Sequence, residues 1–131
     1  KHQMTSILPL SIYAIPEISM VGVTEDECMA KQTPYVVGRA YFKNNPRGQI
    51  IGDMSGMIKL LFSPHNKRLF GVHIIGEQAS ELIHIGAHVM MAGGMIDVFV
   101  QAIYNYPTLA GLYKDAATDG LMNLAKWRAS E

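Results

Sequence analysis

Four acidic and histidine side chains have a spacing that could bind a metal ion. Glu77, Glu81, His84 and His88 fall on one face at helical spacing, and Glu81-x-x-His84 has the spacing of a carboxylate–histidine ligand pair. A dimetal bundle needs two such motifs and two further helices that carry glutamates, and the sequence has no four-helix pattern. We therefore expect no metal site, but a half-exposed polar helix face on which Glu81 interacts with His84.

A second group of polar side chains leads into a proline. Tyr104 and Tyr106 precede Pro107, whose fixed φ and missing N–H suit the first position of a helix. Gly120 stands where a C′ glycine would end that helix. The apolar residues between them recur at helical spacing: Leu109, Leu112, Ala116 and Ala117. The pattern predicts a stiff corner that holds both tyrosines at a helix start; on pattern alone, most such corners only direct the chain into its core.

Two single residues could be reactive but have a structural interpretation. Cys28 is the only cysteine, so the chain can form neither an internal disulfide nor a CxxC motif. We expect it to be a small buried apolar residue, and a reduced, cytoplasmic compartment fits this cysteine content. His73 lies within a predicted strand, where we expect a core histidine with its hydrogen bonds satisfied.

The composition excludes several classes of partner. The charges of eleven basic and eleven acidic residues cancel, and the basic residues form no stripe along the sequence. This argues against nucleic acid and acidic membrane surfaces as partners. The longest apolar stretch, residues 84–103, contains two histidines, Asp97 and three glycines, so it is a poor membrane span. No Gly-x-Gly-x-x-Gly follows a strand and no Walker motif occurs, so this chain alone should not bind FAD or a nicotinamide nucleotide tightly.

The 131 residues predict one domain, 1–131, with an N-terminal linker over 1–8 and a C-terminal tail over 121–131. Strands are expected at Ile12–Ile15, Tyr35–Phe42, Gly56–Ser63 and Arg68–Gly76, the last two as a hairpin. Asn44–Gly48 is expected to be a loop, after which Gln49–Gly52 could re-enter the sheet. Helices are expected at Glu25–Gln32, with a Thr24/Glu27 capping box, at Gln78–Ala92 and at Asp97–Gln101.

The hairpin carries apolar residues on both of its faces. A sheet of this kind must be covered twice. We expect the following helix to cover one face and a partner subunit to cover the other.

Two segments resemble one known family. Residues Pro16 to Glu27 match the signature Pro-Glu-(Ile/Val)-(Ala/Ser)-x-Val-Gly-x-Thr-Glu-x-(Glu/Asp) with which the flavin-dependent pyridine nucleotide–disulfide oxidoreductases begin their dimerisation domain. Near the other end, Pro107-Thr108 matches the His-Pro-Thr corner of that domain. Here Tyr106 stands at the position of the histidine and Gly111 at that of a glutamate. The resemblance covers nearly the whole chain, from Pro16 to Gly120.

The resemblance implies an α+β fold, with a mostly antiparallel sheet of about five strands and packed helices, as in FAD/NAD-linked reductase dimerisation domains. It implies a piece of a longer polypeptide whose FAD- and NAD(P)-binding domains are absent from this chain. It also implies a homodimer through the sheet and the C-terminal helices. Tyr106 and Pro107 would line the partner subunit's FAD across that interface, with a backbone carbonyl of the corner toward the isoalloxazine ring. The Tyr106–Pro107 peptide would be cis.

Positions 106 and 111 bear on the reaction. In the disulfide reductases the histidine exchanges protons with a dithiol and the glutamate orients it, which requires a pKa near the working pH. A free tyrosine titrates at about pH 10, and glycine has no carboxylate. We therefore expect no catalytic residue in this chain.

Asn105 to Thr108 and Ile83 to Gly86 also resemble the soluble pyridine nucleotide transhydrogenases, which pass hydride between NAD(H) and NADP(H) through FAD. Two alternatives stay open. One is a dihydrolipoamide-dehydrogenase-like disulfide reductase with an unusual acid. The other is a stand-alone dimerisation module without catalysis.

Overall fold

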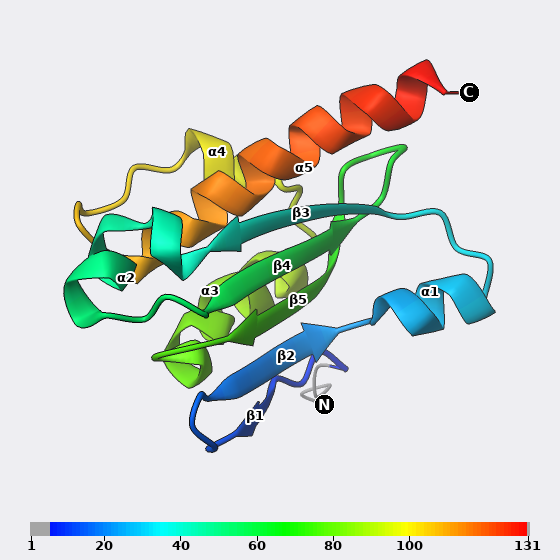
Figure 1. Cartoon of the computed structure of the whole chain (residues 1–131). Helices are drawn as coiled ribbons and strands as arrows, with labels where there is room; N and C mark the ends of the chain where they lie inside the picture. Colours follow the sequence, from blue (N-terminus) through cyan, green and yellow to red (C-terminus); the bar gives the residue numbers. More distant parts are fainter. Residues whose placement is uncertain (1–5, 131) are drawn as a thin grey trace.

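The computed structural model describes residues 6–130 as one antiparallel sheet with helices on one face and at its ends (Figure 1). Its five strands lie in the order β1-β2-β5-β4-β3. The strands are β1 (Leu10–Ile12), β2 (Ile18–Gly22), β3 (Val36–Tyr41), β4 (Met57–Phe62) and β5 (Leu69–Ile75). The helices are α1 (Glu25–Ala30), α2 (Pro46–Ile51), α3 (Ala79–Met91), α4 (Asp97–Gln101) and α5 (Leu112–Ala129), with 3₁₀ turns η1 (Phe42–Asn44) and η2 (Leu109–Gly111).

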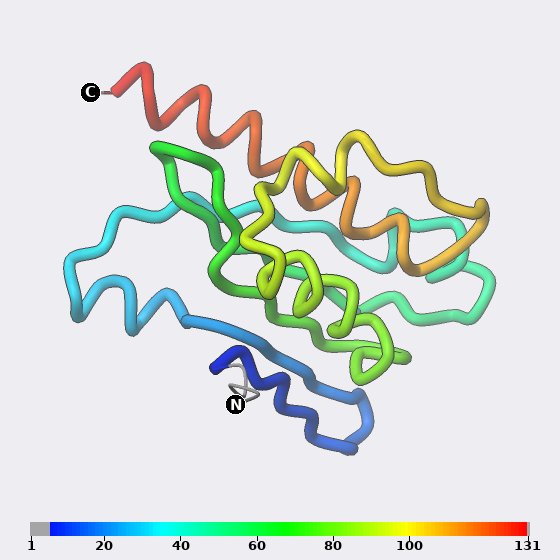
Figure 2. Tube along the Cα trace, turned by 180° about the vertical axis from the view of Figure 1, so that it is seen from behind, coloured from blue at the N-terminus to red at the C-terminus, as the bar shows by residue number. Residues whose placement is uncertain are grey.

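The core lies between the sheet and the helices α3 and α5. Figure 2 shows the sheet from behind, with α3 packed on β5 and β2 and with α5 along β3. Strand residues with a period of two point into this layer, because alternate side chains share one face of a strand. They include Val21, Val36, Ile58, Leu60, Phe62, Val72 and Ile74. The expected α+β class and five-stranded antiparallel sheet are confirmed.

Most of the expected elements are found close to their predicted bounds. The hairpin of β4 and β5, the strand β3 and the helices α3 and α4 are confirmed. Thr24 and Glu27 form the expected capping box at α1, with Glu27 N donating to Thr24 Oγ1 at 3.1 Å and Thr24 N donating to Glu27 Oε2 at 2.9 Å. Cys28 is buried as expected, and this burial raises the pKa of its thiol.

The predicted helix end at Gly120 is wrong. Helix α5 continues through Gly120 to Ala129, so the expected tail over 121–131 is helical up to Ala129. Gly120 is buried against Phe62 and Gly38, and it allows the helix to approach the sheet closely rather than ending the helix. Farther along, Trp127 lies edge-on to His65 with ring centroids 5.8 Å apart, which attaches the end of α5 to the β4–β5 turn.

The predicted loop and strand between residues 44 and 52 are also wrong. This segment forms α2, because the Asn45 side chain accepts a hydrogen bond from Gly48 N at 3.0 Å and Pro46 occupies the first turn. Gly52 ends the helix in the left-handed region, at φ 76°.

At the N-terminus the strands are shifted from their predicted places. The strand expected at Ile12–Ile15 lies at Leu10–Ile12, and a second strand that we did not expect, β2, follows Pro16 and pairs with β5. Ser19 joins the two strands, since its hydroxyl donates to Leu10 O at 2.9 Å. Of the linker expected over 1–8, residues 1–5 lie outside the described part, and Ile7 packs against the core.

Candidate functional site

The Tyr106 corner, residues 105–108, lies between α4 and η2. Its Tyr106–Pro107 peptide is cis, which confirms the expectation for this bond. Pro107 is not the first residue of a helix, contrary to the prediction, because the chain stays extended at Thr108 and turns only at η2. Tyr106 is 83% exposed, whereas Tyr104 is half-buried and burial raises the pKa of its phenol. The two tyrosines therefore differ: one side chain faces outward and the other is packed against the core.

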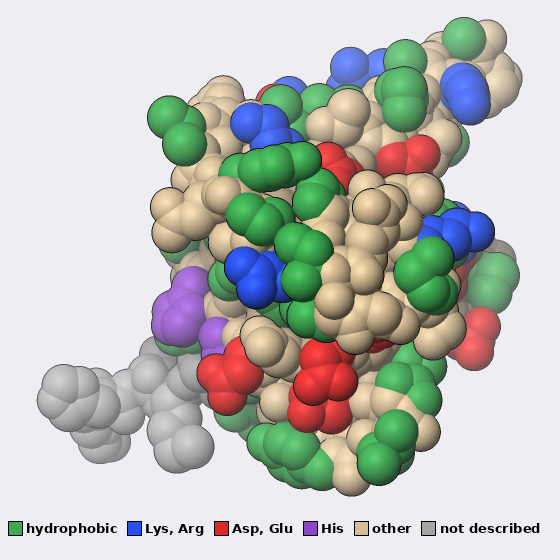
Figure 3. Space-filling view, turned by 60° about the vertical axis from the view of Figure 1, so that its left-hand side comes forward, with side chains coloured by type: hydrophobic (Ala, Val, Ile, Leu, Met, Phe, Trp, Pro, Cys, Tyr) green, Lys and Arg blue, Asp and Glu red, His purple; other side chains and the backbone are tan. Residues whose placement is uncertain are grey.

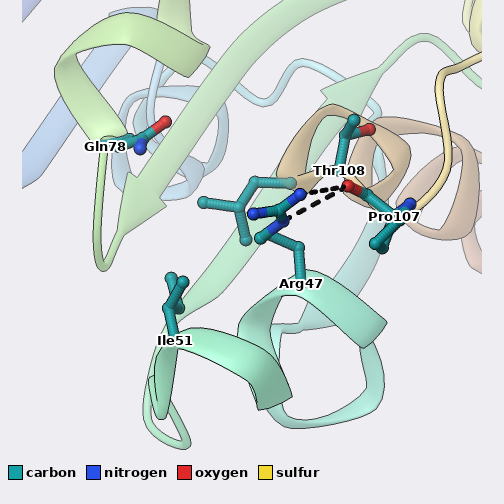
Figure 4. Close-up of a pocket in the computed structure, with 6 residues that line it drawn as sticks. Arg47, Ile51, Gln78, Pro107 and Thr108 are labelled. Carbon is teal, nitrogen blue, oxygen red and sulfur yellow. Dashed lines mark hydrogen bonds between the residues drawn. The ribbon is translucent and has the colours of Figure 1, made fainter.

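Asn45 and Arg47, at the start of α2, hold this corner in place, and Figure 4 shows the contact made by Arg47. Arg47 donates from Nε and Nη2 to the carbonyl oxygen of Pro107, at 3.2 and 3.1 Å. Asn45 Nδ2 donates to the carbonyl oxygen of Thr108 at 3.0 Å. Within the corner, Thr108 Oγ1 donates to the carbonyl oxygen of Asn105 at 2.7 Å. Sequence reasoning missed Arg47 and Asn45 as site residues. We expected a loop there; the Asn45–Pro46 pair could have indicated the start of a helix, but not the contact with the corner.

Two shallow cavities lie beside the corner. One, of about 260 Å³, is lined by Arg47, Ile51, Gln78, Pro107, Thr108 and Leu109. The other, of about 290 Å³, includes Tyr104, Tyr106, Gly111 and Asp115 in its wall. Figure 3 views the end of the molecule that carries α2 and shows hydrophobic side chains gathered there among charged ones. Residues of the corner thus line both hollows.

The family model of the pyridine nucleotide-disulphide oxidoreductase dimerisation domain matches residues 8–117. The chain belongs to this family. It is 48% identical to a soluble pyridine nucleotide transhydrogenase of Mycobacterium bovis, over 88% of this chain and 25% of the relative. It is also 48% identical to a soluble pyridine nucleotide transhydrogenase of Pectobacterium carotovorum, over 89% of this chain and 80% of the relative. A transhydrogenase of Sodalis glossinidius is 47% identical over 93% of this chain and 27% of the relative. The chain thus spans about a quarter of the first and third of these proteins.

Solved structures share the fold of this dimerisation domain. The HOCl-induced flavoprotein disulfide reductase RclA from Escherichia coli matches with a TM-score of 0.82 and 23% identity, over 87% of this chain and 26% of that chain. LpdA from Mycobacterium tuberculosis matches with a TM-score of 0.80 and 22% identity, over 85% of this chain and 24% of that chain. At these identities the likeness concerns the fold alone.

Gly111, which the resemblance places where the family has a glutamate, is at an open position. A Cβ built on Gly111 would have only Asn45 Nδ2 near it, at 3.8 Å. Tyr113 does not fill this space, because it is fully buried and its hydroxyl donates to Leu82 O at 2.7 Å and accepts from Gly86 N at 3.1 Å. Asp115 lines the cavity beside Tyr106, and partial burial raises the pKa of its carboxyl. No imidazole lines that cavity.

The expected polar face of α3 is present without the expected contact. Glu81, His84 and His88 are exposed, but His84 receives no hydrogen bond from Glu81; instead His88 Nδ1 donates to the His84 carbonyl oxygen at 2.6 Å. Among the described residues, no three histidine, cysteine, aspartate or glutamate side chains are placed to hold a metal ion. Of the helices formed by residues 6–130, none combines the length and apolar character that crossing a membrane requires.

His73 differs from the expected satisfied core histidine. It lies on β5 between Met20 and Lys59 on the neighbouring strands, on the sheet face opposite α3 and α5. Both ring nitrogens are buried, and neither has a hydrogen-bond partner in the part of the chain that the structure describes. Burial, and then the positive charge of Lys59, lower the pKa of this imidazole.

Proposed function

We propose that this chain is the dimerisation domain of a flavoprotein that transfers hydride between NAD(H) and NADP(H) through FAD. The observation that carries the proposal is the chemistry of the corner. At position 106 stands a phenol that is 83% exposed and makes no hydrogen bond with the described residues, and position 111 has no side chain. An imidazole–carboxylate pair for proton exchange with a dithiol is therefore missing. The 46–48% identity to proteins named soluble pyridine nucleotide transhydrogenase supports the same conclusion.

The corner fits the edge of a flavin ring. The Tyr106 carbonyl oxygen receives no hydrogen bond from residues 6–130, and the Tyr106 phenol and the Pro107 ring offer apolar surface beside it. An acceptor flanked by apolar groups suits a planar aromatic group that carries N–H donors. In this proposal Tyr106 and Pro107 bind the FAD of the partner subunit, whose main site lies in the remainder of the polypeptide. FAD supplies the hydride chemistry when bound, so these residues position the ring and transfer no proton.

The proposed homodimer uses the sheet and the C-terminal helices. The sheet face opposite α3 and α5 contains His73, whose ring nitrogens are buried without partners, and the half-buried apolar residues Met20, Met57 and Ile75. On the helical side, large apolar side chains remain exposed: Met91, Met95, Val98, Ile103 and Met122. These exposed apolar side chains support the proposed contact with a partner subunit. The low cysteine content supports a cytoplasmic location as part of the same proposal.

The test uses the full-length polypeptide that contains this domain. It should purify as a yellow dimer by size-exclusion chromatography with light scattering, and NADPH should reduce an NAD⁺ analogue in its presence. Lipoamide and glutathione, offered as acceptors in parallel, should be reduced at least a hundred times more slowly. Brisk reduction of either disulfide would favour the dihydrolipoamide-dehydrogenase-like alternative. A polypeptide that purifies without flavin would favour the stand-alone module, and a monomer would contradict the proposed interface.

A further inference from the structure

The four carbonyl groups of the Tyr106 corner are not equivalent. The carbonyl oxygens of Asn105, Pro107 and Thr108 accept hydrogen bonds from Thr108, Arg47 and Asn45, respectively. That of Tyr106 accepts none from residues 6–130. The corner therefore has one free acceptor, held between neighbours whose own acceptors are occupied.

Arg47 supplies two of these hydrogen bonds to a single oxygen. The guanidinium is a rigid planar fork, so its Nε and Nη2 can reach the Pro107 oxygen together only from one direction (Figure 4). This fixes the plane of the peptide that follows Pro107. Because the proline ring also fixes φ of Pro107, the orientation of the Tyr106 carbonyl on its other side is restrained as well.

The residues that hold the corner are themselves attached to the core. Asn45 is 3% exposed, and its side chain both caps α2 and donates to Thr108. Gly48 in α2 lies directly on the backbone of Phe42, where a Cβ would overlap the Phe42 carbonyl oxygen. Phe42 is fully buried. Arg47 therefore extends from a helix that has little freedom to move relative to the sheet.

We propose that Arg47 is a positioning residue for the flavin, which holds the Tyr106 carbonyl toward the ring of the partner subunit through its two hydrogen bonds to Pro107. This inference rests on the proposed function and deepens it. It assigns the orientation of the Tyr106 carbonyl to a residue about sixty positions earlier in the chain. Arg47 does not touch the ring. Its effect reaches the flavin through the backbone of the corner.

The experiment compares variants of the full-length flavoprotein. Arg47→Leu removes both hydrogen-bond donors, and Arg47→Lys can replace one of them. Arg68→Leu is the matched control, because the exposed Arg68 guanidinium makes no hydrogen bond or ion pair with the described residues. Each variant is measured for flavin retention on dilution, the position of the flavin absorption band, kcat and KM, and for its dimeric state.

For Arg47→Leu we expect flavin retention and kcat to fall about tenfold, the loss typical of a charged hydrogen bond, with KM for both nucleotides nearly unchanged. In the same variant the flavin absorption band should shift and the dimer should persist. Flavin retention and kcat of Arg47→Lys should lie between those of wild type and Arg47→Leu, and those of Arg68→Leu should match wild type. An unshifted band with unchanged flavin retention in Arg47→Leu would overturn the inference.

Two further outcomes separate this inference from the function that it builds on. In the first, Arg47→Leu is dissociated or unfolded while Arg47→Lys has normal flavin properties. This result would assign Arg47 a purely structural role and would also overturn the inference. If wild type retains flavin but reduces a disulfide instead of NAD⁺, the proposed function fails, whereas the flavin spectra still decide the role of Arg47.

Discussion

Gly38 on β3 and Gly120 on α5 lie against each other where the last helix crosses the edge strand. A Cβ built on Gly38 would lie 2.8 Å from Gly120 Cα and would overlap the Ala116 carbonyl oxygen. The helix that follows the Tyr106 corner can reach the sheet because neither residue has a side chain at this crossing.

Gly38→Ala should therefore destabilise the domain. The added methyl group meets backbone atoms that cannot rotate away, so α5 must move outward, and overpacking of this kind costs about 1–3 kcal/mol. Urea unfolding followed by circular dichroism measures the loss. Gly111→Ala is the control, because that position is open and not left-handed, and it should be neutral or slightly stabilising. Equal stability of the two variants would show that the contact between β3 and α5 is loose.

Tyr113→Phe should remove a buried link between α5 and α3. The hydroxyl lies between Leu82 O and Gly86 N of α3, and its loss leaves buried polar groups with fewer partners. We expect a loss of about 1–3 kcal/mol in the free energy of unfolding. Tyr104→Phe removes a hydroxyl that makes no hydrogen bond with the described residues, so it should change stability much less in the same urea titration. A Tyr113→Phe domain as stable as wild type would contradict this role.

His73 should make the stability of the domain depend on pH. Its pKa in the folded state lies below the ordinary value of 6.5, because of burial first and then the charge of Lys59, while Glu25 and Glu27 of α1 oppose the shift. The unfolded chain therefore binds the proton first as pH falls. The contribution of His73 to the free energy of unfolding is therefore fully present above about pH 6.5 and decreases below it.

His73→Phe should flatten this part of the stability curve. Urea titrations between pH 7 and 5 at one protein concentration measure the slope, and His84→Gln, at an exposed histidine, serves as the control. The slope should shrink in His73→Phe and persist in His84→Gln. Identical slopes in wild type and His73→Phe would rule out His73 as the source.

Tyr106→Ala should separate folding from flavin binding. The side chain is 83% exposed in the isolated domain, so its truncation should change the free energy of unfolding by no more than about 0.5 kcal/mol. In the full-length flavoprotein the same change should lower flavin retention several-fold, because the phenol is proposed to lie against the ring. Fluorescence of released FAD measures the second effect, and unchanged retention would remove Tyr106 from the proposed site.

The sequence by itself determined the elements whose signals lie within one turn or one hairpin. The capping box at Thr24, the β4–β5 hairpin, α3 and the two family segments could all be identified from neighbouring residues. Local hydrogen bonds and the alternation of apolar side chains suffice for these elements. The chemistry of position 106, tyrosine in place of histidine, could also be read directly.

Only the tertiary structure decided the roles of Gly120, Asn45 and Arg47. Gly120 has the residue type of a helix end, but it lies within α5 because β3 approaches it there. Asn45 has the signature of a helix cap, yet it also holds Thr108, and Arg47 holds Pro107, across about sixty residues of chain. Such contacts arise when distant segments pack together, and the pattern of neighbouring residues contains no information on which segments will meet.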